Sequence, residues 1–171
     1  TLLAVAQLIA AKPGEHGLGV GTGTGNLAGM LLSAGAIMDA VDQSNAMLAQ
    51  CRAKHPGVTA KLGNALSLPY VESRFHFIVS AFALHHLDAA QQKLALEEMH
   101  RVLRPRGRIC IAGLMNDGAA AGAAAAAGTD RFPSDLSALI GWFRERRYTT
   151  FRHRVSDDIQ IVYAIHLYEE E

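Results

Sequence analysis

A run of alternating glycines near the start of the chain is the first feature with chemical consequences. The segment Gly17–Ala28 has the sequence G-L-G-V-G-T-G-T-G-N-L-A, and helix-compatible residues follow from Asn26. Glycine adopts positive φ easily and lets a ligand approach the backbone, because it has no Cβ. A helix that begins after the loop would also offer free N–H groups to an anionic group. We therefore expect the loop Gly21–Gly25 to bind a ligand, and Gly17 to form a turn.

An acidic residue follows this loop at an informative distance. Asp42 stands 21 residues after Gly21, at the end of a second apolar stretch, in A-V-D-Q-S. In doubly wound sheets, a carboxylate at this distance accepts hydrogen bonds from ribose hydroxyls. The alternative is that Asp42 caps the next helix, a role for which Ser44 competes. We favour the ribose role, because the loop and the acid occur together.

The same loop matches one nucleotide-binding motif and does not match another. Gly23, Gly25 and Ala28 satisfy G-x-G-x-x-A, a pattern typical of nicotinamide-dependent enzymes, so this function stays an alternative. No G-x-x-x-x-G-K-[ST] motif occurs in the chain, which argues against a nucleoside-triphosphate P-loop.

Two adjacent histidines, His85 and His86, follow a later apolar stretch in F-I-V-S-A-F-A-L-H-H-L. An imidazole in a binding pocket can change its protonation near neutral pH. The alternative is that one histidine packs against the sheet and the other begins the next helix. Two adjacent histidines without a third ligand do not form a metal site, so we expect no metal.

The elements that must position these residues alternate between strands and helices. Strands are expected at 18–20, 36–41, 58–62, 75–81, 108–114, 148–155 and 159–167, and helices at 1–12, 26–34, 45–54, 89–103 and 134–146. This alternation predicts a doubly wound α/β fold, in which ligands bind beyond the carboxyl ends of parallel strands. Only Ser156-Asp157-Asp158 separates the last two strands, which predicts an antiparallel hairpin.

Composition narrows the class of protein. The chain has 171 residues, and its 16 Lys and Arg balance 16 Asp and Glu, so no overall field attracts nucleic acid or anionic membranes. No apolar run of 18 residues occurs, so no membrane span is expected. Two cysteines are few for a disulfide scaffold, which favours a reduced, cytoplasmic setting.

We expect a single domain over residues 1–171. The chain does not begin with Met, and its first residues already have a helical pattern, so we expect it to be N-terminally truncated. The alanine run at 119–128 has no amphipathic face, which leaves 117–130 as a poorly defined insertion.

With these segments in view, the chain resembles class I S-adenosylmethionine-dependent methyltransferases, and within them the small-molecule branch of the ubiquinone and menaquinone methyltransferases. The glycine loop, Asp42, L-G-N-A-L-S-L-P (62–69), the histidine segment (77–87) and R-V-L-R-P-R-G-R-I (101–109) carry the resemblance, which covers about residues 15–115. It implies a Rossmann-like seven-stranded sheet in the order 3-2-1-4-5-7-6, with S-adenosylmethionine as the cofactor.

The resemblance also implies roles by position. The glycine loop would wrap the methionine part of the cofactor, Asp42 would hold the ribose, and the residues after the third strand would meet the adenine. The end of the fourth strand would face the sulfonium. The cofactor-binding residues expected in this way are Gly21, Thr22, Gly23, Gly25, Asp42, Gln43, Met47, Asn64, Ala65, Ala81 and Phe82.

Four positions depart from the family's pattern. Gly19 stands where the family usually has Asp or Glu, which removes a carboxylate and weakens a strand. Asn64 replaces a commoner Asp but still offers a carbonyl oxygen to the adenine amino group. His76 replaces a frequent Asp, and Arg106 replaces a glycine.

The implied function is methyl transfer to a small-molecule acceptor by in-line displacement. The protein would mainly supply alignment and a dry site. His85 and His86 are the candidate catalytic residues, because a general base is needed only where the acceptor must lose a proton. The alternatives are an NAD(P)-dependent oxidoreductase and a cofactor-binding module that has lost activity.

A nucleic-acid acceptor is disfavoured on two grounds. The basic cluster of Arg144, Arg146 and Arg147 with Arg152 and Arg154 gives no strong support for a nucleic-acid stripe of alternating basic and aromatic residues, so a solvated helix face explains it better. No asparagine-proline-proline-aromatic tetrapeptide follows the fourth strand, which argues against amino-directed nucleic-acid methyltransferases.

Overall fold

The computed structural model describes residues 1–116 and 131–167, so the expected insertion 117–130 lies outside the described residues. The strands are β1 (His16–Val20), β2 (Ile37–Asp42), β3 (Thr59–Leu62), β4 (Phe75–Ala81), β5 (Leu103–Asn116), β6 (Ser134–Asp135), β7 (Tyr148–Arg154) and β8 (Ile159–His166). The described helices are α1 (Leu2–Ile9), α2 (Asn26–Ser33), α3 (Asn45–Lys54), the one-turn 3-10 helix η1 (Leu84–His86), α4 (Ala89–Val102) and α6 (Leu136–Glu145).

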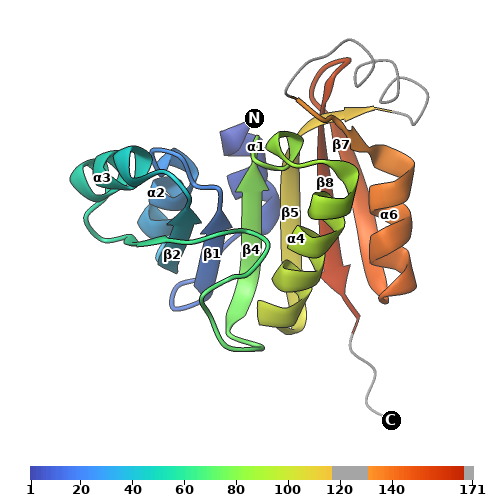
Figure 1. Ribbon diagram of the computed structural model, residues 1–171. Coiled ribbons are helices and arrows are strands. Elements are labelled where there is room, and N and C mark those ends of the chain that lie inside the picture. The colour runs from blue at the N-terminus through green and yellow to red at the C-terminus, as the bar shows by residue number, and fades with distance from the viewer. Residues whose placement is uncertain (117–130, 168–171) are drawn as a thin grey trace.

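The strands form one open sheet in the order β3-β2-β1-β4-β5-β8-β7, with the two-residue β6 paired to β5 off this path (Figure 1). The pairs from β3 to β5 are parallel, whereas β8 pairs antiparallel with both β5 and β7. With β6 set aside, this order is the expected 3-2-1-4-5-7-6. The doubly wound fold class and the C-terminal hairpin are therefore confirmed.

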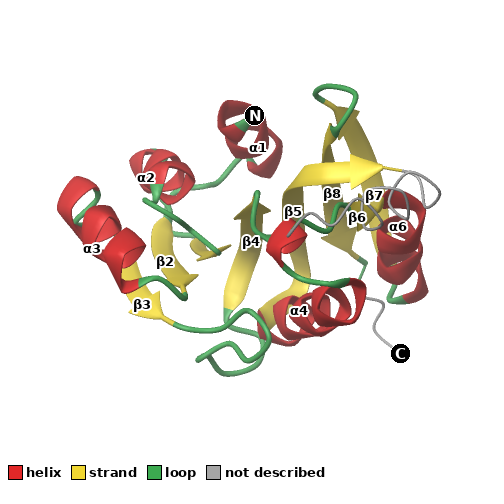
Figure 2. Cartoon of the chain, turned by 45° about the horizontal axis from the view of Figure 1, so that its top comes forward, coloured by secondary structure: helices red, strands yellow, loops and turns green. Residues whose placement is uncertain are grey.

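Helices cover both faces of the sheet. Figure 2 shows α1, α2 and α3 on one side and α4 with α6 on the other. The apolar core is divided in the same way: Ile9, Leu31 and Phe77 belong to one buried cluster, and Met99 and Phe143 to the other. Strands buried on both faces require near-continuous apolar runs, which explains the buried apolar stretches Phe77–Val79 in β4 and Ile109–Ala112 in β5.

Two local expectations were wrong. Gly17 lies inside β1 rather than in a turn, and a Cβ there would stand 2.1 Å from the Phe77 ring. The strand expected at 108–114 begins at Leu103, because the pairing with β4 shifts between Phe75 and Phe77 and absorbs the Pro-Arg-Gly segment. Arg106 in this segment has φ 63°, a backbone conformation that favours glycine.

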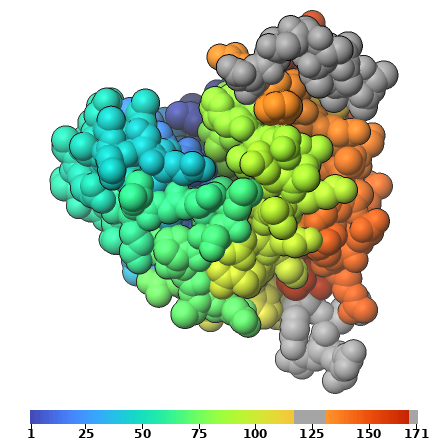
Figure 3. Space-filling view, in the orientation of Figure 1, coloured from blue at the N-terminus to red at the C-terminus, as the bar shows by residue number. Residues whose placement is uncertain are grey.

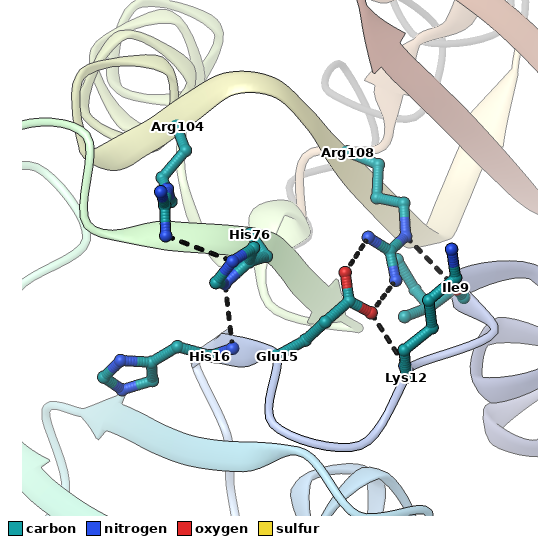
Figure 4. A network of polar contacts seen from close by, with 7 residues as sticks. All are labelled: Ile9, Lys12, Glu15, His16, His76, Arg104 and Arg108. Carbon is teal, nitrogen blue, oxygen red and sulfur yellow. Dashed lines mark hydrogen bonds and ion pairs between the residues drawn. The ribbon is translucent and has the colours of Figure 1, made fainter.

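A polar network ties α1 to the first residues of β1, β4 and β5 (Figure 4). Arg108 donates two hydrogen bonds to Glu15 and one to the carbonyl oxygen of Ile9. In the same figure the backbone N–H of His16 donates to Nδ1 of His76, at 3.0 Å, and Arg104 Nη1 lies 3.1 Å from Nε2 of that ring. The network fixes the end of the sheet opposite to the glycine loop.

We expect His76→Asp to raise the free energy of unfolding by about 1 kcal/mol, because a carboxylate accepts a charge-assisted hydrogen bond. The His16 amide can only donate, so the Nδ1 atom of His76 must accept. In the neutral form of the ring the proton then lies on Nε2, which faces the guanidinium of Arg104, a group that can only donate. A carboxylate would accept from both groups, although the nearby Glu15 charge opposes the gain. Urea denaturation at constant m-value measures the effect.

The control for this substitution is His76→Asn, which keeps an acceptor for the amide but adds no charge. It should gain less than His76→Asp. A lower unfolding midpoint for His76→Asp than for the wild type would contradict the assignment of donors around this ring.

Candidate functional site

A cavity of about 790 Å³ opens at the carboxyl ends of β1, β2 and β4. β1 pairs with β2 on one side and with β4 on the other, so the cavity lies where the chain's strand order reverses. In Figure 3 blue atoms of the N-terminal part are visible between the cyan atoms around α3 and the yellow-green atoms near the start of α4. This is the place at which doubly wound sheets bind their ligands.

The glycine loop forms one wall of this cavity and turns sharply onto α2. Gly21, Gly23 and Gly25 all have positive φ, between 56° and 84°. A Cβ at Gly21 would lie 2.4 Å from the Ala83 Cβ, and one at Gly25 would lie 2.4 Å from the Cys51 Sγ, whereas nothing lies within 4 Å at Gly23. Gly21 and Gly25 therefore serve close packing inside the protein, and Gly23 faces open space. Gly25 is the N-cap of α2 and does not line the cavity.

Asp42 joins the end of β2 to the glycine loop. Its Oδ2 accepts a hydrogen bond from the Gly23 N–H, and its Oδ1 accepts one from the Ser44 N–H, both at 2.9 Å. The cap of α3 is Ser44, whose Oγ accepts from the Met47 N–H, so Asp42 is not the capping residue. Each carboxylate oxygen keeps a further acceptor position, and Asp42 lines the cavity.

The other residues expected at the cofactor also line the cavity. They are Thr22, Gln43, Met47, Asn64, Ala65, Ala81 and Phe82. The Asn64 Oδ1 accepts a hydrogen bond from the Leu66 N–H. This bond fixes the orientation of the Asn64 side chain and leaves its NH2 group as a donor for a ligand. Phe82 has φ 58°, and left-handed backbone at a non-glycine residue is concentrated at binding sites.

The two candidate histidines are separated by the structure. His86 lines the cavity, whereas His85 is only 8% exposed and does not line it. Burial lowers the pKa of His85, and the neighbouring His86 and Arg131 lower it further. The His85 ring packs 4.3 Å from the His86 ring, measured between centroids, and its Nδ1 has no hydrogen-bond partner among the described residues. The structure therefore leaves His86 as the candidate acid–base residue at the cavity.

Several lining residues were missed at the sequence level. They are Leu2, Gly63, Leu66, Ser80, Leu84, Leu87 and Gln91, together with Gly19. Ser80 stands beside Ala81 at the end of a strand, and its Oγ donates to the Val20 carbonyl oxygen at 3.1 Å. Its place at a strand end is the signal in the sequence that could have identified it as a lining residue. Leu2 comes from α1, and no local pattern brings it to this cavity.

Across residues 1–116 and 131–167, no group of three or more His, Cys, Asp or Glu side chains is placed to hold a metal ion. No helix in these ranges is long and apolar enough to cross a membrane.

The sheet order and the cavity, with its glycine loop and acidic strand end, define a Rossmann-like α/β fold with its binding cavity at the point where the strand order reverses. Comparison with protein families gives the class: the family described as "Methyltransferase domain" matches residues 18–107, and the chain belongs to this family. The nicotinamide-dependent alternative is therefore not retained.

Curated relatives carry related names. An uncharacterized methyltransferase of Oceanobacillus iheyensis is 36% identical over 52% of this chain and 42% of its own length. An uncharacterized methyltransferase of Bacillus pumilus is 31% identical over 94% and 81%. The demethylmenaquinone methyltransferase of Beutenbergia cavernae is 31% identical over 64% and 45%. The chain thus spans less than half of the first and third of these relatives.

Solved structures agree on the fold. A putative methyltransferase from Bacillus halodurans superposes with a TM-score of 0.81 at 17% identity, covering 98% of this chain and 99% of that one. The magnesium protoporphyrin IX methyltransferase of Synechocystis, solved with bound S-adenosylhomocysteine, superposes with a TM-score of 0.77 at 14% identity, covering 96% and 83%.

Proposed function

We propose that the protein transfers a methyl group from S-adenosylmethionine to a small-molecule acceptor by in-line displacement. The observation that carries the proposal is one cavity that joins the glycine loop, Asp42 and the end of β4. The quinone methyltransferase names among the relatives support a small-molecule acceptor.

The lining residues fit the cofactor chemically. The backbone at Gly23 is open to a ligand, and Asp42 has acceptor positions left for ribose hydroxyls. Gln43 and Met47 would lie beside the adenine, with Asn64 and Ala65 at its edge. Ala81 and Phe82, at the end of β4, would face the sulfonium, which supplies an activated methyl group when the cofactor is bound.

Alignment and exclusion of water are the protein's main contributions to this reaction. Leu66, Leu84 and Leu87 line the same cavity and give it apolar walls. His86 lines the cavity and could remove a proton from the acceptor, and an acceptor that loses no proton would not need it.

Calorimetry and turnover together test the proposal. S-adenosylhomocysteine should bind the wild-type protein at micromolar concentration, whereas NAD should not bind. Turnover of labelled S-adenosylmethionine with thiol, phenol and quinone acceptors then separates an enzyme from an inactive binding module. Binding of NAD without binding of S-adenosylhomocysteine would overturn both the methyltransferase and the inactive S-adenosylmethionine-binding module.

We expect Gly19→Asp to tighten S-adenosylmethionine binding about three- to tenfold. Gly19 lines the cavity, and a Cβ there would make only an ordinary contact with the Thr22 Oγ1, at 3.4 Å. A carboxylate at this site would attract the cationic cofactor, at a strength typical of a partly desolvated charge pair. Calorimetry with S-adenosylmethionine measures it.

The neutral variant Gly19→Asn is the matched control, and it should leave the affinity within about twofold of the wild type if charge is the cause. Equal gains from both variants would contradict an electrostatic role.

We also infer that the protein works in the cytoplasm. Cys51 and Cys110 are buried free thiols, and burial raises the pKa of both, to about 12 for Cys110. A reducing compartment suits a chain with free cysteines.

A further inference from the structure

The first turn of α4 carries two glutamines that face different partners. Gln91 takes part in the capping box with Asp88 and lines the cavity. Gln92 points to the neighbouring backbone instead. Its Nε2 donates to the carbonyl oxygens of Leu84, Leu87 and Phe132, at 2.9 to 3.0 Å, and its Oε1 accepts from the Ser134 Oγ, at 2.9 Å.

These partners belong to two segments that are distant in sequence. Leu84 and Leu87 flank the two histidines, and both leucines line the cavity. Phe132 belongs to the segment that leads into β6, and its N–H donates to the His85 carbonyl oxygen at 2.7 Å. One side chain therefore joins the cavity wall 84–87 to the segment 132–134.

The wall has few hydrogen bonds of its own. Within η1 the His86 N–H lies 3.3 Å from the Ala83 carbonyl oxygen, and the Leu87 N–H donates to the Leu84 carbonyl oxygen at 2.9 Å. A single turn of 3-10 helix is too short to be stable by itself, because the cost of nucleating a turn is spread over very few bonds. Bonds from outside the turn must hold it in place.

We propose that Gln92 is a positioning residue that fixes the backbone of residues 84–87, and with it His86, at the acceptor end of the cavity. That the methyl acceptor binds at this end of the cavity rests on the proposed function. The carboxamide suits the role because two donor hydrogens and one acceptor oxygen on a planar group meet three carbonyl oxygens and one hydroxyl. If a carboxylate replaced the carboxamide, its acceptor oxygens would face the three carbonyl oxygens with no hydrogen between them, which is repulsive.

Hydrogen exchange of the full chain tests the position directly, with Gln92→Glu as the nearly isosteric variant and Gln92→Met as a variant without polar atoms. We expect the amides of His86, Leu87 and Phe132 to exchange at least tenfold faster in both variants. The affinity for S-adenosylhomocysteine should stay within about twofold of the wild type, because Gln92 is not among the residues that line the cavity. Gln50→Glu, on the exposed side of α3, is the matched control and should change neither quantity.

A second readout separates positioning from a general loss of stability. The NMR chemical shifts of the His86 ring protons should change in both Gln92 variants and stay unchanged in Gln50→Glu. As the pH falls, the carboxyl introduced by Gln92→Glu gains a proton that it can donate, so exchange in that variant should slow relative to Gln92→Met.

Two results would overturn the assignment. One is wild-type exchange rates at His86 and Phe132 in both variants; the other is faster exchange spread evenly over the sheet with unchanged chemical shifts of the His86 ring protons. Failure of the wild-type protein to bind S-adenosylhomocysteine would instead overturn the proposed function and leave the exchange result standing.

Discussion

Asp42→Ala should weaken S-adenosylhomocysteine binding by about 1–3 kcal/mol, which is roughly a five- to 150-fold rise in Kd. The carboxylate holds the Gly23 and Ser44 N–H groups and faces the cavity. The substitution therefore removes the proposed ribose acceptor and also releases the glycine loop. Calorimetric titration of both proteins under the same buffer measures the loss.

The two effects of this substitution can be separated. With an S-adenosylhomocysteine analogue that lacks both ribose hydroxyls, the loss of affinity on Asp42→Ala should be smaller, because only the release of the glycine loop remains to cause it. Asp42→Asn keeps one acceptor oxygen and should fall between the two proteins. Asp157→Ala, whose side chain is 92% exposed in the far hairpin, is the control for loss of charge. An unchanged Kd in Asp42→Ala would remove Asp42 from the proposed site.

The glycine loop and Asp42 could be found from sequence because both are local signals with a fixed meaning. Positive φ at Gly21, Gly23 and Gly25 is allowed by residue type, and an acidic strand end at a set distance follows from the βαβ unit. The strand order could be predicted for a similar reason, since the alternation of elements and the resemblance allow few topologies.

The parts that could not be predicted depend on contacts between distant segments. Gly17 is required by the Phe77 ring, 60 residues away, and its sequence neighbours carry no sign of this. Gln92 looks like any polar residue of a helix, and its role exists only because the chain returns at Phe132. His85 and His86 are equivalent in sequence, but the 3-10 turn buries one and exposes the other to the cavity.

Arg108→Met should lower the free energy of unfolding by about 3–5 kcal/mol, because it leaves a largely buried carboxylate without its partner. The Arg108 and Glu15 side chains are only 15% and 16% exposed, and two hydrogen bonds of 2.7 and 2.9 Å join them. Arg108 also donates to the Ile9 carbonyl oxygen and lies over the Phe77 ring, so its loss affects α1 as well. Urea denaturation at pH 7 measures the change.

The pH dependence shows whether the charge pair is the cause. The Arg108 guanidinium lowers the pKa of Glu15 from 4.5 to about 2, so the pair stabilises the wild type fully above pH 4.5 and loses its effect as the pH falls toward 2. The difference in stability between wild type and Arg108→Met should therefore shrink over this interval. The double variant Glu15→Gln with Arg108→Met should recover part of the loss at pH 7, because no unpaired charge remains. A difference that is constant from pH 7 to pH 2 would assign the loss to packing on Phe77 and not to the pair.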